Sequence, residues 1–356
     1  MRISVTHPAD LGDTEVLAWH AMQRATYSLR NPFLCPEFAI GVGKFRSEAR
    51  VAVLTGASGS ILGFLPFDRR RFGVAMPIGA GLSNCQGLVH VPALEWEARE
   101  VLRGCRVSAW QFDNLVAGQA PFERYAAASV PVGAIDLAGG FDVYWKDLQV
   151  RSARFLRDVR RRSRSLERDF GELRLECDLQ DTAALRMLMG WKSEQCRRND
   201  WLDVFDRPWV AGLVEYLLSR RSDLFSPSLS VLYAGETPIA GQLGLRCGSY
   251  FAGWFTAYDG RFASYSPGLV QLLRLVKELA NSGVELIDMG GTATYQNKLK
   301  SLDLPFTKGM VTSGPLTGGV YRVRQTSAAW ARRQIRQYPP AYRAAGYVLR
   351  RSGRIA

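Results

Sequence analysis

Residues that bind metals or form disulfide bridges are scarce in this sequence. Its 356 residues include three histidines, and the six cysteines are scattered without a Cys-x-x-Cys pair. Structural zinc sites and disulfide frameworks both depend on clusters of these residues. We therefore expect no metal and no disulfides, and the composition fits a reducing cytoplasmic compartment. A Ser-His-Asp triad is not excluded, but the Gly-x-Ser-x-Gly turn that often carries its serine is missing.

Long hydrophobic runs are missing as well. The longest uncharged stretch, residues 72–94, is interrupted by glycines, prolines and polar residues, whereas a membrane-spanning helix needs about 20 mostly apolar residues in succession. The N-terminal segment has no apolar core of the kind that marks a secretory leader. We therefore expect a cytoplasmic protein, with peripheral contact at the inner face of the membrane as an alternative.

Positive charge is concentrated in two segments. The formal net charge is +13, and residues 151–168 hold eight arginines against two acidic residues, while residues 321–356 hold nine arginines and no acidic residue. Five arginines of the first segment share one helix face through spacings of three and four: Arg154, Arg157, Arg161, Arg164 and Arg168. Such a face is either solvated or bound to an anion. A nucleotide sugar, a lipid-linked diphosphate, a tRNA, a cyclic dinucleotide or an anionic membrane surface would each fit.

Two stretches of the chain resemble each other at a constant offset. Residues 51–67 and 229–245 match in several apolar residues and glycines without gaps, 178 positions apart. Both patterns predict a strand, a tight turn and a second strand. Unrelated hairpins also share valines and glycines, but the single offset favours a duplication. It predicts a first domain over residues 1–140, a second over 150–318 and a basic tail over 319–356.

The second half mixes helices with strands. After three helical segments we expect strands over 229–234, 239–246 and 249–258, a helix over 267–281 and a strand over 284–290. Ser266 suits the N-cap of that last helix and Pro267 its first turn. An antiparallel run followed by a crossover helix and another strand indicates an α+β or mixed α/β fold.

Five motifs follow one another in a recognisable order. They are NPFLCPEF (31–38), WKSEQ (191–195), YDGRFASYSPGLVQL (258–272), IDMGG (287–291) and YQNKLKS (295–301). The set resembles GNAT-type acyltransferases, in particular the cellulose-biosynthesis CelD group, which is related to the Fem peptidyltransferases. The resemblance covers residues 150–310, and the first half matches mainly through its first motif. It implies tandem GNAT-like domains, each a mostly antiparallel mixed sheet flanked by helices, with the first copy degenerate.

The resemblance also implies a coenzyme A site. GNAT enzymes hold the pyrophosphate on an Arg/Gln-x-x-Gly-x-Gly/Ala loop at a helix N-terminus, and residues 261–266 take that place with serine where glycine is usual. The residues expected to contact acetyl-CoA or another acyl-CoA are Arg261, Ser264, Ser266, Gly268 and Leu269. The alternative is a strand-to-helix turn with an ordinary cap.

Proton transfer is assigned to two residues near the last motifs. Asp288, at the end of an expected strand, would orient an amine or accept its proton, and Tyr295 would protonate the leaving thiolate. The alternatives are that Asp288 caps the following turn and that Tyr295 packs on the sheet with its hydroxyl in water.

The acceptor is assigned to a groove beside the helix that carries WKSEQ. The residues expected to contact it are Trp191, Lys192, Tyr258, Asp259 and Lys298, where Lys298 replaces the lysine that the family has at position 296. Trp191 would stack on a sugar ring, although a tryptophan in an amphipathic helix is more often part of the core.

The implied reaction is N-acyl transfer from acyl-CoA to an amine without a metal. The acceptor would be an amino sugar or a lipid-linked saccharide in exopolysaccharide or cell-envelope biosynthesis. One alternative is a Fem-like aminoacyl transferase that uses charged tRNA, which the basic helix favours less because Phe155 is the one aromatic residue within it. Another is a non-catalytic regulator that binds a cyclic dinucleotide or a membrane.

Overall fold

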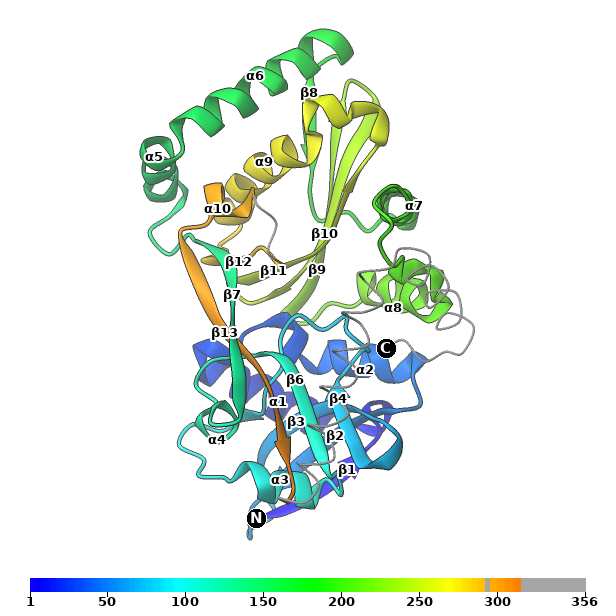
Figure 1. The fold of residues 1–356 in the computed structure, drawn as a ribbon, viewed down its shortest axis with the longest axis vertical. Helices are drawn as coiled ribbons and strands as arrows, with labels where there is room; N and C mark the ends of the chain where they lie inside the picture. The colour runs from blue at the N-terminus through cyan, green and yellow to red at the C-terminus, as the bar shows by residue number, and fades with distance from the viewer. Residues whose placement is uncertain (292–294, 315–356) are drawn as a thin grey trace, which may run out of the picture.

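The strands of both halves form one mixed sheet in this computed structural model, which describes residues 1–291 and 295–314. In the first half the strands are β1 (Arg2–Thr6), β2 (Ala49–Thr55), β3 (Ile61–Arg69), β4 (Val74–Pro77), β5 (Val89–His90), β6 (Ala109–Leu115) and β7 (Ala126–Asp136). In the second half they are β8 (Leu173–Glu176), β9 (Phe225–Ala234), β10 (Thr237–Cys247), β11 (Tyr250–Tyr258), β12 (Leu286–Asp288) and β13 (Leu302–Thr312). Their order across the sheet is β1-β2-β3-β4-β6-β13-β7-β12-β11-β10-β9-β8, with β5 paired to β3 (Figure 1).

Helices cover the sheet in each half. The first half contains α1 (Asp13–Ala25), α2 (Pro36–Phe45), α3 (Ala98–Gly104) and α4 (Ala120–Glu123). The second contains α5 (Phe141–Arg151), α6 (Ala153–Phe170), α7 (Thr182–Arg198), α8 (Pro208–Leu218), α9 (Pro267–Asn281) and α10 (Gln296–Leu299). Three short 3-10 turns bear on the site: η3 (Pro32–Leu34), η5 (Val204–Asp206) and η6 (Gly260–Tyr265). None of the helices in the described ranges is both long and apolar enough to cross a membrane.

The two halves follow the same plan. Each has an antiparallel run that ends in one parallel pair, β4 with β6 across α3 and β11 with β12 across α9. Both repeats seen in the sequence are hairpins, β2–β3 and β9–β10, and each has a register irregularity near its turn. The expected mixed α/β fold, with a mostly antiparallel sheet flanked by helices, is confirmed.

The last strand of each half is exchanged with the other half. β13 pairs antiparallel with both β6 and β7, and β7 pairs on its other side with β12. The first half therefore completes its sheet with a strand from the end of the described chain. The sequence-based domain limits of 1–140 and 150–318 stay a prediction, and the basic tail over 319–356 lies outside the described residues.

Aromatic residues of the first half pack onto β11 of the second. The rings of Phe33 and Phe38 meet Trp254 edge-on at centroid distances of 5.6 and 5.9 Å. One hydrophobic core contains residues from both halves, including Phe33, Phe38, Leu213 and Leu243. This shared core fixes the first half against β11.

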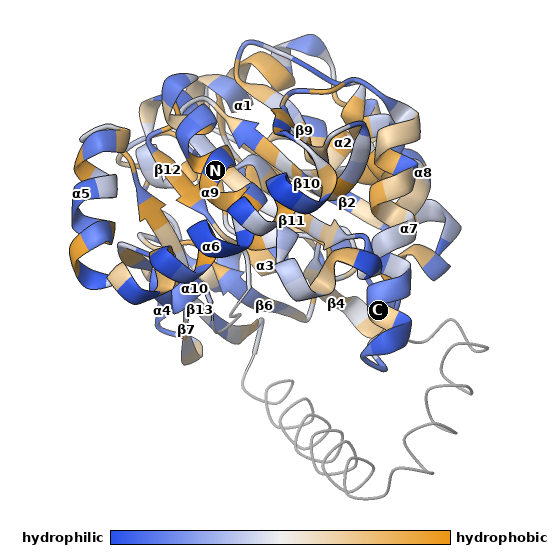
Figure 2. Ribbon diagram, turned by 90° about the horizontal axis from the view of Figure 1, so that it is seen from above, coloured by the Kyte–Doolittle hydropathy of each residue, from blue (hydrophilic) through white to orange (hydrophobic). Residues whose placement is uncertain are grey.

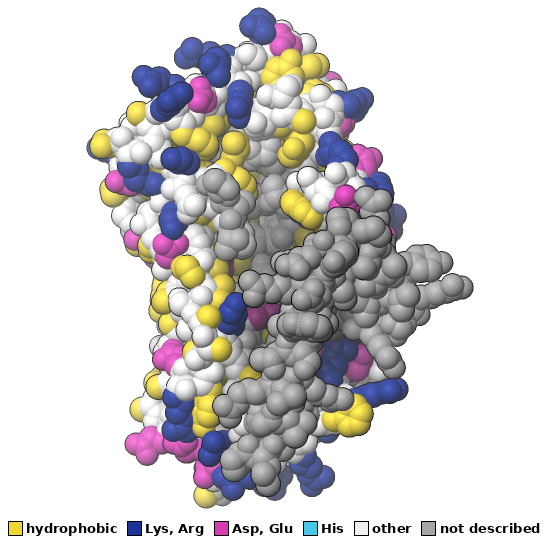
Figure 3. Space-filling view, viewed as in Figure 1, with side chains coloured by type: hydrophobic (Ala, Val, Ile, Leu, Met, Phe, Trp, Pro, Cys, Tyr) yellow, Lys and Arg dark blue, Asp and Glu magenta, His cyan; other side chains and the backbone are white. Residues whose placement is uncertain are grey.

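The basic helix α6 lies at the outer end of the second half (Figure 1), and most of its residues are hydrophilic (Figure 2). Leu156, Val159 and Leu166 are buried beneath it, and α6 packs on α9. The five arginines expected on one face are all exposed. Lys and Arg side chains gather over this end of the molecule in Figure 3, so the face is open to a partner.

The local signals around α9 are only partly borne out. The helix spans Pro267–Asn281, as expected, but Ser266 has a left-handed backbone (φ 51°) and its side chain makes no capping hydrogen bond. Its hydroxyl instead accepts a hydrogen bond of 2.6 Å from the Arg162 guanidinium. Ser266 therefore occupies the expected N-cap position of α9, but its hydroxyl is bound by Arg162 of α6 and does not cap the first turn.

Candidate active site

The sheet opens at the junction of β11 and β12. β12 pairs with β11 only from Tyr250 to Ala252, while β11 continues to Tyr258. Within the described ranges no strand pairs with that edge of β11 beyond Ala252. The ladder to β10 shifts register there, which leaves Trp254 as the extra residue of a bulge. Backbone groups along this edge have no strand partner and can bind the amides or carbonyl of a ligand, apart from the Thr256 carbonyl, which Lys192 contacts.

Asp288 ends β12 at this junction and is 1% exposed. Its carboxylate accepts hydrogen bonds from the Gly290 N–H at 2.9 Å and from the Tyr250 hydroxyl at 3.2 Å, and Asn31 of the first half donates to that hydroxyl at 3.1 Å. Burial raises the pKa of Asp288 to about 6, although these hydrogen bonds act in the opposite direction. The pKa of the carboxyl is thus close to neutral pH, but the carboxyl lies beneath the surface.

Tyr295 lies beyond Asp288 at the start of α10 and is 37% exposed. Burial of part of its ring raises the pKa of its hydroxyl, so it is protonated at neutral pH. Lys298, one turn on, is exposed, and its carbonyl accepts a hydrogen bond of 2.7 Å from Ser152. No described contact joins Tyr295 to Asp288, so their joint role in proton transfer stays a prediction.

A loop of the first half, residues 78–86, also borders this junction. The Trp254 indole donates to the Leu82 carbonyl at 3.1 Å. Gly290 packs so closely against the Gly253 carbonyl that an added Cβ would come within 2.7 Å of it, and the Asn84 amide would lie 3.4 Å away. Sequence reasoning did not assign this loop to the site, although Gly79 and Gly81 were a local signal of close backbone packing.

The expected pyrophosphate loop is a 3-10 turn, η6, whose N–H groups are largely used within it. Arg261 N–H donates to the Asp259 carboxylate, Phe262 N–H to the Asp259 carbonyl and Ser266 N–H to the Ala263 carbonyl. In the first turn of α9, Leu269 N–H donates to Ser266. The Leu269 N–H, which was expected to bind the pyrophosphate, is therefore already hydrogen-bonded in this conformation.

Side chains around η6 are also paired. The Arg261 guanidinium is bound to Asp259 with a shortest distance of 2.6 Å, which holds the pKa of that carboxyl below its usual range. Ser264 is exposed. Gly268 has room, because an added Cβ would meet only the Tyr258 ring at 3.7 Å. The structure thus brings Tyr258, Asp259, Arg261 and Gly268 together at one end of β11.

The helix expected to wall the acceptor groove is α7, which packs on β11. Trp191 is buried in the core and offers no face to a ligand. Lys192 points toward β11, where its ammonium donates to the Thr256 carbonyl at 3.3 Å and to Gln195 at 3.0 Å. Burial lowers the pKa of Lys192. Of the two neighbours, only Lys192 is positioned near the open edge.

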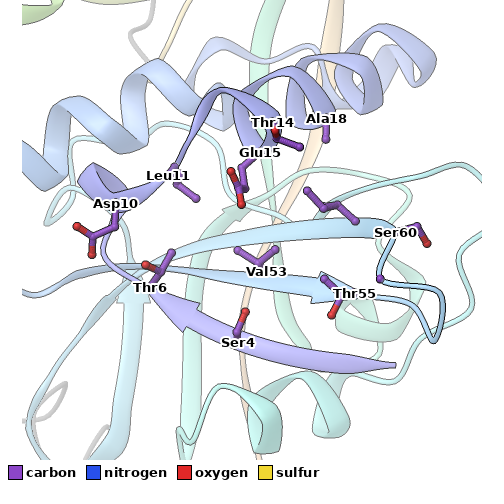
Figure 4. Close-up of a pocket in the computed structure, with 12 residues that line it drawn as sticks. Ser4, Thr6, Asp10, Leu11, Thr14, Glu15, Ala18, Val53, Thr55 and Ser60 are labelled. Carbon is purple, nitrogen blue, oxygen red and sulfur yellow. The ribbon is translucent and has the colours of Figure 1, made fainter.

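A separate cavity of about 610 Å³ opens in the first half between α1 and the strands β1, β2 and β3 (Figure 4). Asp10 and Glu15 contribute carboxylates to its wall, and Ser4, Thr6 and Thr55 contribute hydroxyls. None of the residues that line it carries a positive charge, and none was assigned to the site. It adds nothing to the chemistry at β11.

The open strand pair, with a helix crossing between its members, lies in a segment that also matches a known family. Residues 153–298 match the family model of the acetyltransferase (GNAT) domain. The match is confined to the second half of the chain. The match does not distinguish the CelD group from other members of the family. Among curated protein sequences none matches the chain. Acyl transfer is the chemistry that this family supports.

Solved structures share the fold over both halves. The crystal structure of FemX is 11% identical over 85% of this chain and 98% of its own, with a TM-score of 0.56. A Bacteroides thetaiotaomicron protein of unknown function is 10% identical over 85% and 97%, with a TM-score of 0.53. The C-terminal domain of an Agrobacterium fabrum lysylphosphatidylglycerol synthetase is 13% identical over 87% and 96%, with a TM-score of 0.50. At these identities the likeness shows the fold alone.

Proposed function

We propose that this protein is an N-acyltransferase that moves an acetyl or longer acyl group from acyl-CoA to an amine. The observation that carries the proposal is the open, bulged edge of β11 within a GNAT domain. Backbone N–H groups on this edge would polarise the thioester carbonyl, and its carbonyls would bind the amides of the donor. No metal is needed, and the described residues include no cluster that could hold one.

The chemistry requires two proton transfers. The acceptor amine attacks the thioester carbon, loses a proton and forms an amide, and the C–S bond breaks to release a thiolate that takes up a proton. We assign the first proton to Asp288, which a pKa of about 6 suits, and the second to the hydroxyl of Tyr295. Because Asp288 is 1% exposed, the acceptor amine would have to reach it through a hydrogen-bonded partner.

The proposed acceptor is an amino sugar or a lipid-linked saccharide of the cell envelope, used in the cytoplasm or at the inner face of the membrane. Lys192, Tyr258, Asp259 and Lys298 are its proposed contacts. The choice of acceptor rests on the resemblance of the motifs to the CelD group. The family match supports acyl transfer without indicating the acceptor.

Calorimetry with acetyl-CoA tests the donor. We expect saturable binding that is lost in the presence of coenzyme A, and acetylation of glucosamine or of its nucleotide-linked form by the parent protein. Failure to bind acetyl-CoA or any longer acyl-CoA would remove this proposal.

A second candidate is aminoacyl transfer from charged tRNA. It is supported by the internal use of the N–H groups in η6 and by the exposed arginine face of α6. RNA bound to that face would dissociate steeply with salt, because phosphate contacts release counterions. Binding of charged tRNA without binding of acyl-CoA would favour this candidate. Binding of neither, together with binding of a cyclic dinucleotide or of anionic vesicles, would favour a regulator.

A further inference from the structure

Three arginines converge where the two halves meet, away from the arginine-rich segments of the sequence. Arg46 follows α2 and Arg70 follows β3 in the first half, and Arg207 directly precedes α8 in the second. α2 packs on α8. We call these three residues the interface arginines.

Two of the interface arginines face a buried carboxylate without bonding to it closely. Asp68 is fully buried and accepts hydrogen bonds from the N–H groups of Gly79 and Ala80. Its Oδ2 lies 3.6 Å from Arg46 Nε and 3.7 Å from Arg70 Nη2, beyond hydrogen-bond distance. Arg46 Nε and Arg70 Nε and Nη2 are buried and have no hydrogen-bond partner within residues 1–291 and 295–314.

The guanidinium of Arg46 is held in place by its other contacts. It donates to Glu48 at 3.0 Å and lies over the Trp209 ring at 4.6 Å, with 12% of the side chain exposed. Stacking on an aromatic ring fixes a guanidinium plane and leaves its edge for an anion. Arg46 is therefore preorganised.

Arg207 has no acidic partner among the described residues. Burial lowers the pKa of its guanidinium, and Arg46 and Arg70 lower it further. A half-buried arginine that is repelled by two others and paired with none destabilises the protein, unless an anion joins it. Asp68 and Glu48 offset part of the charge of Arg46 and Arg70, since Glu48 also lies 3.7 Å from Arg70 Nη1. Arg207 is left with repulsion alone, at the place where buried guanidinium donors lack a hydrogen-bond partner among the described residues.

Two chains of contacts link the interface arginines to the candidate active site. Phe205, two residues before Arg207, packs on Phe255 of β11 at a centroid distance of 5.0 Å. Asp68, which faces Arg46 and Arg70, holds the start of the loop whose Leu82 bonds Trp254. The same strand and the same loop therefore position both places.

We propose that Arg46, Arg70 and Arg207 bind the phosphoryl group of a diphosphate-linked acceptor and so hold its sugar amine toward β11. Phosphate oxygens accept hydrogen bonds from the paired N–H donors of a guanidinium group. Two or three guanidinium groups neutralise the charge of one diphosphate. The identity of the anion as part of the acceptor rests on the proposed function. The binding of a diphosphate to this cluster does not.

Arg207→Gln is the decisive variant, since the parent side chain has no described ion pair to lose. Titration calorimetry with inorganic pyrophosphate should show at least a tenfold loss of affinity, while the melting temperature stays equal or rises because the repulsion is relieved. Arg103→Gln, an exposed arginine on α3, is the matched control and should bind pyrophosphate like the parent. Equal affinity in the parent and Arg207→Gln, or no binding by the parent, would overturn the proposal.

A second pair of titrations separates this site from the donor site. Arg207→Gln should keep the parent's affinity for acetyl-CoA, whereas Gly268→Glu should keep the pyrophosphate affinity of the cluster. If Arg207→Gln weakens acetyl-CoA as much as pyrophosphate, the cluster serves the donor and the acceptor assignment is overturned. If acetyl-CoA fails to bind at all while pyrophosphate binding still depends on Arg207, the proposed function fails and the anion site stands.

Two probes distinguish the source of the diphosphate. UDP-glucosamine in solution represents a nucleotide-linked acceptor, and phosphatidylcholine vesicles that carry a polyprenyl diphosphate glucosamine represent a lipid-linked one. The probe whose binding falls at least tenfold in Arg207→Gln identifies the source. Equal binding of both probes by the parent and the variant would overturn the proposal.

Discussion

Replacing Asp288 by asparagine tests whether the burial of this carboxyl controls the pH dependence of stability. Asp288 is 1% exposed, and burial raises its pKa from 3.8 to about 6. Asparagine has nearly the same shape, never ionises and keeps an acceptor oxygen for the Gly290 N–H. The variant therefore removes the titration and retains most of the local structure.

The direction follows from the protons bound in the two states. Between about pH 4 and pH 6 the folded protein retains a proton on Asp288 that the unfolded chain has lost, so a rise in pH through this window lowers the free energy of unfolding. Below the window Asp288 costs nothing, and above it the full penalty applies. A shift of about 2 pKa units corresponds to about 3 kcal/mol, at roughly 1.4 kcal/mol per unit.

Urea unfolding of the parent and Asp288→Asn at pH 4 and pH 8 measures the effect. Titrations common to both proteins cancel in the difference between their free energies of unfolding. From pH 4 to pH 8 we expect this difference to shift by about 2 kcal/mol in favour of the variant. An amide that opposes the Tyr250 hydroxyl adds a cost that is the same at both. Asp259→Asn is a control with the opposite sign. Arg261 lowers the pKa of Asp259, so this variant should lose stability relative to the parent as the pH rises. A difference between the parent and Asp288→Asn that does not change with pH would refute the reasoning.

Three other substitutions test the site and the join between the halves. Gly268→Glu should weaken acetyl-CoA binding more than tenfold in calorimetry without lowering the melting temperature, since the position has room for a side chain; unchanged affinity would remove α9 from the donor site. Tyr295→Phe should lower turnover roughly 100-fold while acetyl-CoA still binds, and full turnover would exclude Tyr295 from the chemistry. Asn31→Ala should lower the free energy of unfolding by about 1–3 kcal/mol in urea, because Tyr250 loses a donor and the Phe33 N–H loses its acceptor; equal stability would show that the pair does not hold the halves together.

Local patterns predicted the elements whose causes are local. The helix over 267–281 and the hairpin strands follow from hydrophobic spacing and from turn residues, and the structure has them. Trp191 shows the limit of that reasoning, because its place in the core depends on how α7 packs and not on its neighbours in the sequence. The N-cap position of Ser266 was predicted, but the binding of its hydroxyl by Arg162 of another helix was not.

The parts of the site that come from distant segments had no signal in the sequence. Asp68, the loop at Leu82 and Trp254 are joined only by the fold. The interface arginines come from three separate segments, and none of them belongs to the arginine-rich runs that the composition brought out. The fold of the first half brings Arg46 and Arg70 to Asp68, and the packing of the two halves, which no periodicity records, adds Arg207.

The exchange of β7 and β13 has a consequence for how this protein is made. During synthesis β6 and β7, which end at Leu115 and Asp136, leave the ribosome long before β13, the strand that fits between them and begins at Leu302. Until then the first half has two unpaired strand edges, which are the groups that drive edge-to-edge aggregation. The N-terminal half cannot finish folding as it emerges, and closure of the sheet is a late step between segments far apart in the chain. A chain that stops before Leu302 is therefore expected to be captured by chaperones or to aggregate, even though most of its first half is already made.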